Sequence, residues 1–185
     1  MPNMRREHEP SPIEPQAMEY DASSAADQKK LKDMLASVFD DEAIDQLIFI
    51  LQTIAAEDYT NHCNEATKAL GGRLLERYGE EESFDDLAPT MEFSDVRSYE
   101  KLREYRGDFH SVGVISVHQP KKKMSIIIDP THYVVSSDAK PGAMLVLKVE
   151  GDTQVALKAL GQRYGGLWIV DCILDKKHKQ FRSLV

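Results

Sequence analysis

Three residues of reactive types follow one another along the chain: Cys63, His110 and Asp129. A thiolate is a nucleophile, an imidazole can take and return its proton, and a carboxylate can hold that imidazole in the required orientation. Acyl transfer through a covalent intermediate needs these three roles together. Such a site requires that the surrounding elements bring the three side chains to one place.

The cysteine lies near the start of a predicted helix. Apolar side chains at three- and four-residue spacing predict this helix between Thr60, as its N-cap, and Gly79, as its C-terminal stop. In a first helical turn, unpaired amides and the helix dipole stabilise an anion, so Cys63 is placed to act as a thiolate. A plainer interpretation is a buried cysteine that packs with Ala66 and Leu70 on the apolar stripe.

The histidine and the aspartate belong to a predicted hairpin. The strings HSVGVISVH and MSIII have strand character and are joined by a loop at 119–123. His110 begins the first strand and Asp129 follows the second, so chain reversal brings both to the same end of the ribbon. Each has a plainer interpretation as well: a surface histidine at a strand end, and an Asx turn that Asp129 forms ahead of Pro130 and Thr131.

Three strings, NHCNEATKALGGRLLERYG, FHSVGVISV and SIIIDPTHY, resemble the core motifs of the transglutaminase-like and papain-like cysteine enzymes. In those families the nucleophilic cysteine begins a helix, and the histidine and aspartate follow on adjacent antiparallel strands. The resemblance implies that Cys63 is the nucleophile, His110 the general base and acid, and Asp129 the orienting carboxylate. It implies a cysteine protease, deamidase or transglutaminase-like enzyme that acts on a protein or peptide amide without a cofactor.

The chain departs from the family pattern around the cysteine. It has Asn61 where many transglutaminase-like members have glycine, and Asn64 where they often have an aromatic residue. It has Glu57 where papain-like members carry the glutamine that stabilises the oxyanion, and Gln52 is a weak substitute. The backbone N–H of Cys63 supplies one oxyanion donor, and the second is unassigned. A catalytically silent protein-binding module on the same fold is therefore the alternative function.

Other candidate sites have weaker patterns. A metal site could be imagined from His62, Cys63, His110, Asp129 and His132. No CxxC or HxxxH spacing supports it, and neighbouring side chains diverge at a helix start, so we expect no metal. Cys172 and Trp168 are predicted to lie in the core.

The order of patterns predicts an α+β fold, with N-terminal helices followed by an antiparallel sheet and a papain-like or transglutaminase-like core. Residues 1–26, rich in Pro, Glu, Ser and Ala, are predicted to form a disordered tail before a single domain at 27–185. The expected elements are a helix capped by Asp27, a helix after Asp40-Asp41, a helix from Thr60, a short helix from Ser94, the hairpin, a strand at 143–149, a helix from Asp152 or Thr153, and a final hairpin across 175–177.

Composition narrows the function classes. The net charge is −8, and the first hundred residues hold 23 acidic and 9 basic side chains, which argues against nucleic-acid binding. No apolar run is long enough to span a membrane, and none follows the basic residues near the N-terminus as in a secretory signal. With only two cysteines, a reduced cytoplasmic setting is expected, and leaderless secretion as an effector stays open.

Overall fold

The computed structural model describes residues 14–78, 91–105, 107–119, 121–175 and 180–184. In this part of the chain one antiparallel sheet of seven strands runs in the order β1-β5-β4-β3-β2-β6-β7. The strands are β1 (Gln16–Tyr20), β2 (Met91–Ser98), β3 (His110–His118), β4 (Lys123–Asp129), β5 (Met144–Glu150), β6 (Ile169–Asp175) and β7 (Gln180–Ser183). The helices are α1 (Ala25–Leu35), α2 (Asp41–Ala55), α3 (Cys63–Tyr78), α5 (His132–Val135) and α6 (Thr153–Tyr164).

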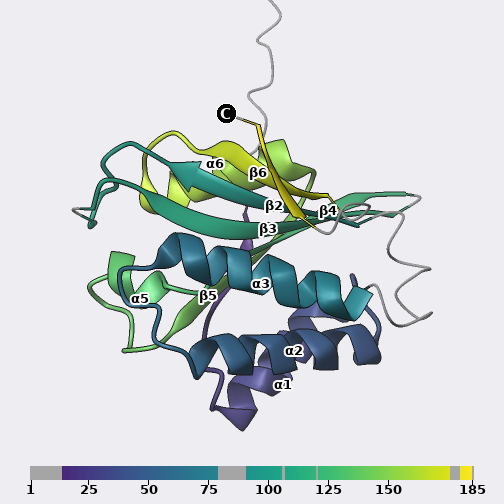
Figure 1. Ribbon diagram of the computed structural model, residues 1–185. Helices are drawn as coiled ribbons and strands as arrows, with labels where there is room; N and C mark the ends of the chain where they lie inside the picture. Colours follow the sequence, from purple (N-terminus) through teal and green to yellow (C-terminus); the bar gives the residue numbers. More distant parts are fainter. Residues whose placement is uncertain (1–13, 79–90, 106, 120, 176–179, 185) are drawn as a thin grey trace, which may run out of the picture.

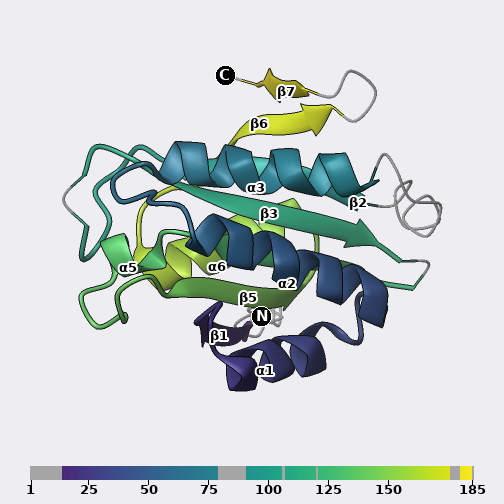
Figure 2. The same ribbon diagram turned by 60° about the horizontal axis from the view of Figure 1, so that its bottom comes forward.

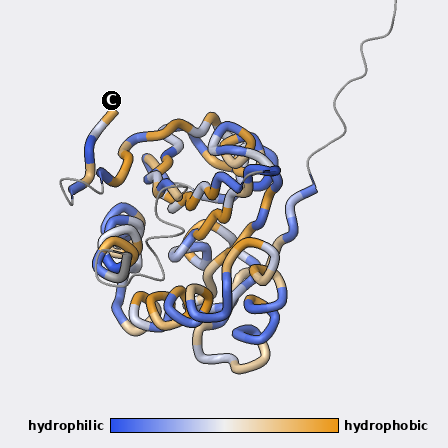
Figure 3. Tube along the Cα trace, turned by 90° about the vertical axis from the view of Figure 1, so that its right-hand side faces the viewer, coloured by the Kyte–Doolittle hydropathy of each residue, from blue (hydrophilic) through white to orange (hydrophobic). Residues whose placement is uncertain are grey.

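The helices cover the sheet on both sides. Helices α2 and α3 lie against one face, with α1 beside the β1 edge, and α6 lies on the other face (Figures 1 and 2). Each face has its own apolar cluster: Ile115 of β3 packs toward α2 and α3, and Val114 packs toward α6. Hydrophobic and hydrophilic residues are interspersed along the trace (Figure 3). The predicted combination of helices with an antiparallel sheet is thus confirmed.

Several elements form where the pattern predicts them. Asp40 caps α2 by accepting a hydrogen bond from Ala43 N, and Asp152 caps α6 in the same way. The β3–β4 hairpin, β5 and the β6–β7 pair are also present. At Gly71, an added Cβ would lie 2.6 Å from the Phe93 ring, so the glycine lets α3 approach β2 closely.

The prediction of a disordered tail is wrong from Gln16 onward. Residues Gln16–Tyr20 pair with β5, in register from Gln16↔Lys148 to Tyr20↔Met144. Tyr20 is fully buried, because the alternation of a short strand turns it toward the core. Residues 1–13 lie outside the described part. Ser24, rather than Asp27, caps α1: its hydroxyl accepts a hydrogen bond from Asp27 N.

The short helix predicted from Ser94 is also wrong, since this segment is strand β2. Phe93 and Val96 lie on opposite faces of that strand, and each belongs to one of the two apolar clusters. Burial on both faces removes the polar–apolar alternation by which a strand is recognised in a sequence. The predicted helix stop at Gly79 falls outside the described residues. None of the helices described is long and apolar enough to cross a membrane.

Candidate thiol site at the end of the sheet

Cys63 is the first residue of α3. The prediction that Thr60 caps this helix is wrong. Ala66 N donates a hydrogen bond to His62 O, so His62 is the residue that immediately precedes the helix. The chain turns sharply just before, where Asn61 has a positive φ of 64° that asparagine tolerates well. Cys63 therefore lies at the helix start, where backbone N–H groups have no partner within the helix.

His110 and Asp129 meet where β3 begins and β4 ends. Their side chains lie on the α6 face of the sheet, and His110 Nε2 is 2.8 Å from Asp129 Oδ2. The other carboxylate oxygen accepts from Thr131 N at 3.0 Å and from Thr131 Oγ1 at 3.4 Å. The Asx turn and the histidine contact use different oxygens, so the two contacts form at the same time.

The thiol contacts the same imidazole. Burial disfavours the imidazolium, but the Asp129 carboxylate and a hydrogen bond with the Cys63 thiol raise the pKa of His110 to about 9. Because Nε2 is engaged by Asp129, Nδ1 is the ring nitrogen left for Cys63. His110 thus hydrogen-bonds to Asp129, and the Cys63 thiol is close enough to act on the pKa of the same imidazole.

The carboxylate is held in its ionised form. Burial would raise the pKa of Asp129, but the charge and hydrogen bond of His110 and a hydrogen bond from Tyr164 lower it below its ordinary value. Tyr164 OH lies 2.7 Å from Asp129 Oδ2. An ionised carboxylate only accepts hydrogen bonds, so the Tyr164 hydroxyl donates to it.

One neighbour of the site, Tyr164, is missed by sequence reasoning. Two others are predicted only in different roles, His132 as a possible metal ligand and Trp168 as a core residue. His132 Nδ1 lies 2.8 Å from the Tyr164 hydroxyl, and the Trp168 ring stands edge-on to His110 at 6.1 Å between centroids. A signal for Tyr164 exists: it shares the buried face of α6 with Ala156 and Leu160, and a buried tyrosine hydroxyl needs a partner.

The upstream oxyanion candidates lie elsewhere. Glu57 is exposed and forms an ion pair with Arg73 at 2.5 Å, and its other oxygen accepts from Tyr59. Gln52 is exposed on α2. The backbone N–H of Cys63, at the helix start, stays the predicted oxyanion donor.

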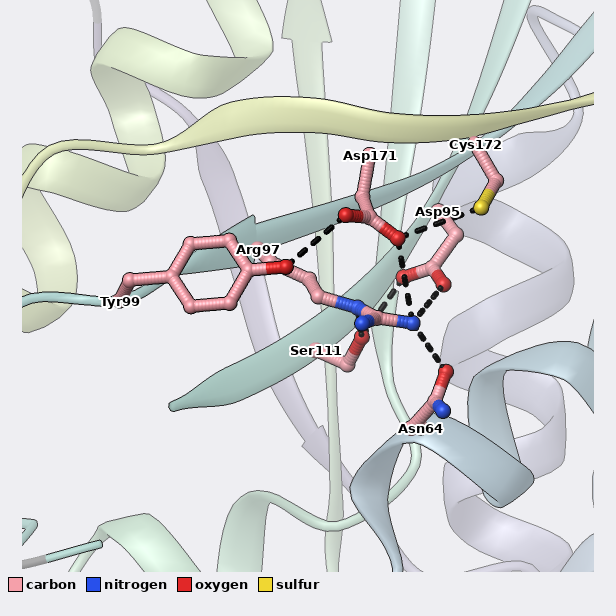
Figure 4. A network of polar contacts seen from close by, with 7 residues as sticks. All are labelled: Asn64, Asp95, Arg97, Tyr99, Ser111, Asp171 and Cys172. Carbon is pink, nitrogen blue, oxygen red and sulfur yellow. Dashed lines mark hydrogen bonds and ion pairs between the residues drawn. The ribbon is translucent and has the colours of Figure 1, made fainter. Parts of the chain in front are cut away.

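A second polar cluster lies beside the start of α3, centred on Arg97 (Figure 4). Arg97 Nη2 is 3.0 Å from Asp95 Oδ2 and 3.2 Å from Asp171 Oδ2, and it also contacts the Asn64 side-chain oxygen. Ser111 and Tyr99 donate to the two carboxylates. The residue after Cys63 is thus tied to β2 and β6.

The second cysteine belongs to this cluster. Cys172 is buried as predicted, but its thiol donates to Asp171 Oδ2 at 3.2 Å instead of packing only on apolar groups. Burial and the Asp171 carboxylate raise the pKa of Cys172 to about 11. Cys172 is therefore a protonated thiol at neutral pH.

Neither group of potential metal ligands forms a convincing metal centre. Ligand atoms of Asp95, Asp171 and Cys172 lie within 4.8 Å of one another. The Arg97 guanidinium already supplies the positive charge there, so a cation would have to displace it. The five metal ligands considered from the sequence do not come together in the structure. His62 is exposed beside Glu65, and His132 is hydrogen-bonded to Tyr164.

No family model, curated protein or solved structure matches the chain. Membership of the transglutaminase-like or papain-like group therefore stays a proposal, and the geometry of the site is what supports it.

Proposed function

We propose that this chain is a cysteine acyltransferase or hydrolase of the transglutaminase-like and papain-like kind, acting on a protein or peptide amide. The observation that carries the proposal is the position of His110, which lies 2.8 Å from the Asp129 carboxylate and whose pKa is raised both by that carboxylate and by the nearby Cys63 thiol. A nucleophile, a base and an orienting group in contact are what acyl transfer requires.

The proposed reaction starts from a protonated His110 beside the Cys63 sulfur, which reacts as the thiolate. With a pKa of about 9, His110 carries a proton at neutral pH, and we assign the proton that is exchanged with the sulfur to Nδ1 because Asp129 engages Nε2. Asp129 compensates the positive charge and fixes the ring through Nε2. Thr131 and Tyr164 in turn hold the carboxylate from both of its oxygens, so the imidazole has one preferred orientation.

In the first half-reaction the Cys63 thiolate attacks the amide carbon, and the carbonyl oxygen takes up the negative charge near the backbone N–H of Cys63. The C–N bond then breaks as His110 Nδ1–H gives its proton to the leaving amine. In the second half-reaction neutral His110 takes a proton from water or from an acceptor amine, which attacks the thioester. The C–S bond breaks and restores the imidazolium–thiolate pair.

A specific observation favours a second function, a silent protein-binding module. Cys63 is 7% exposed and His110 1% exposed. The Tyr105 ring lies 5.8 Å from the His110 ring, and burial together with the nearby Cys63 raises the pKa of the Tyr105 hydroxyl. A substrate carbonyl reaches the sulfur only if the groups that cover it move aside.

The two functions are separated by a covalent probe. The protein is incubated with a peptide vinyl sulfone, and the adducts are mapped by intact-mass and peptide mass spectrometry. We expect one adduct, on Cys63, which persists in Cys172→Ala and is absent in Cys63→Ala. In His110→Gln the rate should fall by a factor of about 100 or more, the usual contribution of a general acid–base group.

Circular dichroism of His110→Gln controls for loss of the fold. Labelling of both cysteines at similar rates, with no change in a folded His110→Gln variant, would contradict the enzyme proposal and favour the binding module.

A further inference from the structure

A cavity of about 270 Å³ lies beside Tyr164, which is one of its lining residues. It is lined by residues of β1, α5 and the end of α6 and of the segments 102–104 and 136–138, and neither Cys63 nor His110 is among its lining residues. The charged residues are Glu19, Arg103, Glu104, Asp138 and Arg163. The cavity therefore does not include the thiol or its base, although Tyr164 and His132 adjoin both places.

A buried imidazole faces this cavity with one nitrogen unsatisfied. Since the Tyr164 hydroxyl gives its proton to Asp129, its oxygen must accept from His132, so Nδ1 of His132 carries a proton. The opposite nitrogen, Nε2, is fully buried and has no hydrogen-bond partner among the described residues. In a neutral imidazole with Nδ1 protonated, Nε2 presents a lone pair, which needs a donor.

The group nearest to this lone pair is itself an acceptor. Glu19 Oε1 lies 3.5 Å from His132 Nε2, within the range of an ion pair, and no hydrogen bond joins the two atoms. When the imidazole is neutral, both atoms are acceptors, and a donor group that approaches the pair from the cavity side can satisfy both. An ammonium group fits because it offers three N–H donors and carries the charge that Glu19 balances.

The same cavity offers a site for negative charge. Arg103 and Arg163 line it, and no carboxylate among the residues described pairs with either guanidinium. The Arg103 backbone is fixed there, since its N–H donates to Tyr164 O at 3.0 Å. Guanidinium groups bind carboxylates through paired N–H donors.

We propose that this cavity binds a small molecule that carries both an ammonium and a carboxylate group, of the size of a free amino acid. Its ammonium group donates to His132 Nε2 and Glu19, and its carboxylate lies against Arg103 and Arg163. A volume of about 270 Å³ is enough for such a ligand. The proposal is independent of any catalysis at Cys63.

Calorimetry on the full chain tests the proposal. The probes are the genetically encoded amino acids, and each one that binds is compared with its N-acetyl form, which lacks the ammonium group, and its methyl ester, which lacks the carboxylate. We expect at least one free amino acid to bind with a Kd of about 1 mM or tighter. Each modified form should bind at least tenfold more weakly.

Variants assign the binding to the cavity. Glu19→Gln and Arg103→Met should each weaken the affinity at least tenfold, whereas Glu150→Gln, an exposed carboxylate outside the cavity, should leave it unchanged. The ¹⁵N resonance of His132 Nε2 should shift on binding. The proposal is overturned if no free amino acid binds at that level, if an N-acetyl form binds equally well, or if Glu19→Gln binds like the unmodified chain.

Discussion

The two cysteines of this chain are shielded from solvent to the same degree, with 7% exposed in each case, but their neighbours differ in charge. Cys63 contacts an imidazole whose pKa of about 9 keeps it positive at neutral pH. Cys172 contacts the carboxylate of Asp171, and its own pKa is raised to about 11. Equal burial therefore does not give equal chemistry.

The carboxylates of the two regions differ in a parallel way. Asp129 has a lowered pKa because one cation and several donors surround it. Asp95 has a raised pKa because its burial, with Asp171 close by, outweighs the stabilising effect of Ser111 and Arg97. In the first region a positive imidazole, His110, lies beside a negative carboxylate, Asp129. In the second region one guanidinium, Arg97, pairs with two carboxylates, Asp95 and Asp171. Only the first is suited to moving a proton.

The largest expected effect is a difference in alkylation rate between the two thiols. Folding raises the pKa of Cys172 from about 9 to about 11, so at neutral pH this thiol has about 100-fold less thiolate than it would have without the shift. We expect iodoacetamide to modify Cys63 faster than Cys172, because the ionisation of Cys172 is suppressed. Peptide-resolved mass spectrometry at pH 7 measures both rates, with Cys63→Ala and Cys172→Ala as controls, and equal rates would remove the basis of the comparison.

The second effect concerns the stability of the arginine cluster. Arg97→Met leaves Asp95 and Asp171 buried without their cation, which should lower the free energy of unfolding by about 3 kcal/mol. Arg97→Lys, which keeps the charge but loses the forked geometry, should cost less. Urea denaturation measures both. A Met variant as stable as the unmodified chain would show that the cluster does not depend on the ion pair.

The sequence predicts the elements of the thiol site better than the details around it. The hairpin of His110 and Asp129 is predictable because strand alternation, the turn and the chain reversal are all local patterns. The contact of Tyr164 with Asp129 is not predictable. The two residues are 35 positions apart in the sequence, and only the packing of α6 on the sheet brings them together. Strand β1 is missed for the same reason, since its five residues form a strand only by pairing with distant β5.

The third effect is a pH dependence of stability that comes from the thiol site. The pKa of His110 is about 9 in the folded protein and about 6.5 in an unfolded chain, so folding favours the protonated form. This contribution, on the order of 3 kcal/mol, is complete below pH 6.5 and disappears as the pH rises to 9. Urea titrations across this range should show the decline in the unmodified chain.

Two features identify His110 as the source of that decline. His110→Gln should flatten the curve between pH 6.5 and 9. Deprotonation of Cys172 lies above this window, because its pKa rises from about 9 to about 11 on folding. A decline of the same size in the Gln variant would assign the pH dependence to another group.

The smallest effect tests whether Tyr164 supports the carboxylate of the thiol site. Tyr164→Phe removes one donor to Asp129 and leaves the Nδ1 proton of His132 without its acceptor, so the free energy of unfolding should fall by about 1–2 kcal/mol. Tyr133→Phe is the matched control, since its hydroxyl makes only a long 3.3 Å contact with exposed Thr60, and should change stability by less than about 0.5 kcal/mol. If both variants lose the same stability, the buried hydroxyl contributes no more than a surface one. If only Tyr164→Phe is destabilised, and alkylation of Cys63 is also slower in this variant, then the Asp129 carboxylate acts on the Cys63 thiol through the His110 imidazole. The comparison with Cys172 requires this result.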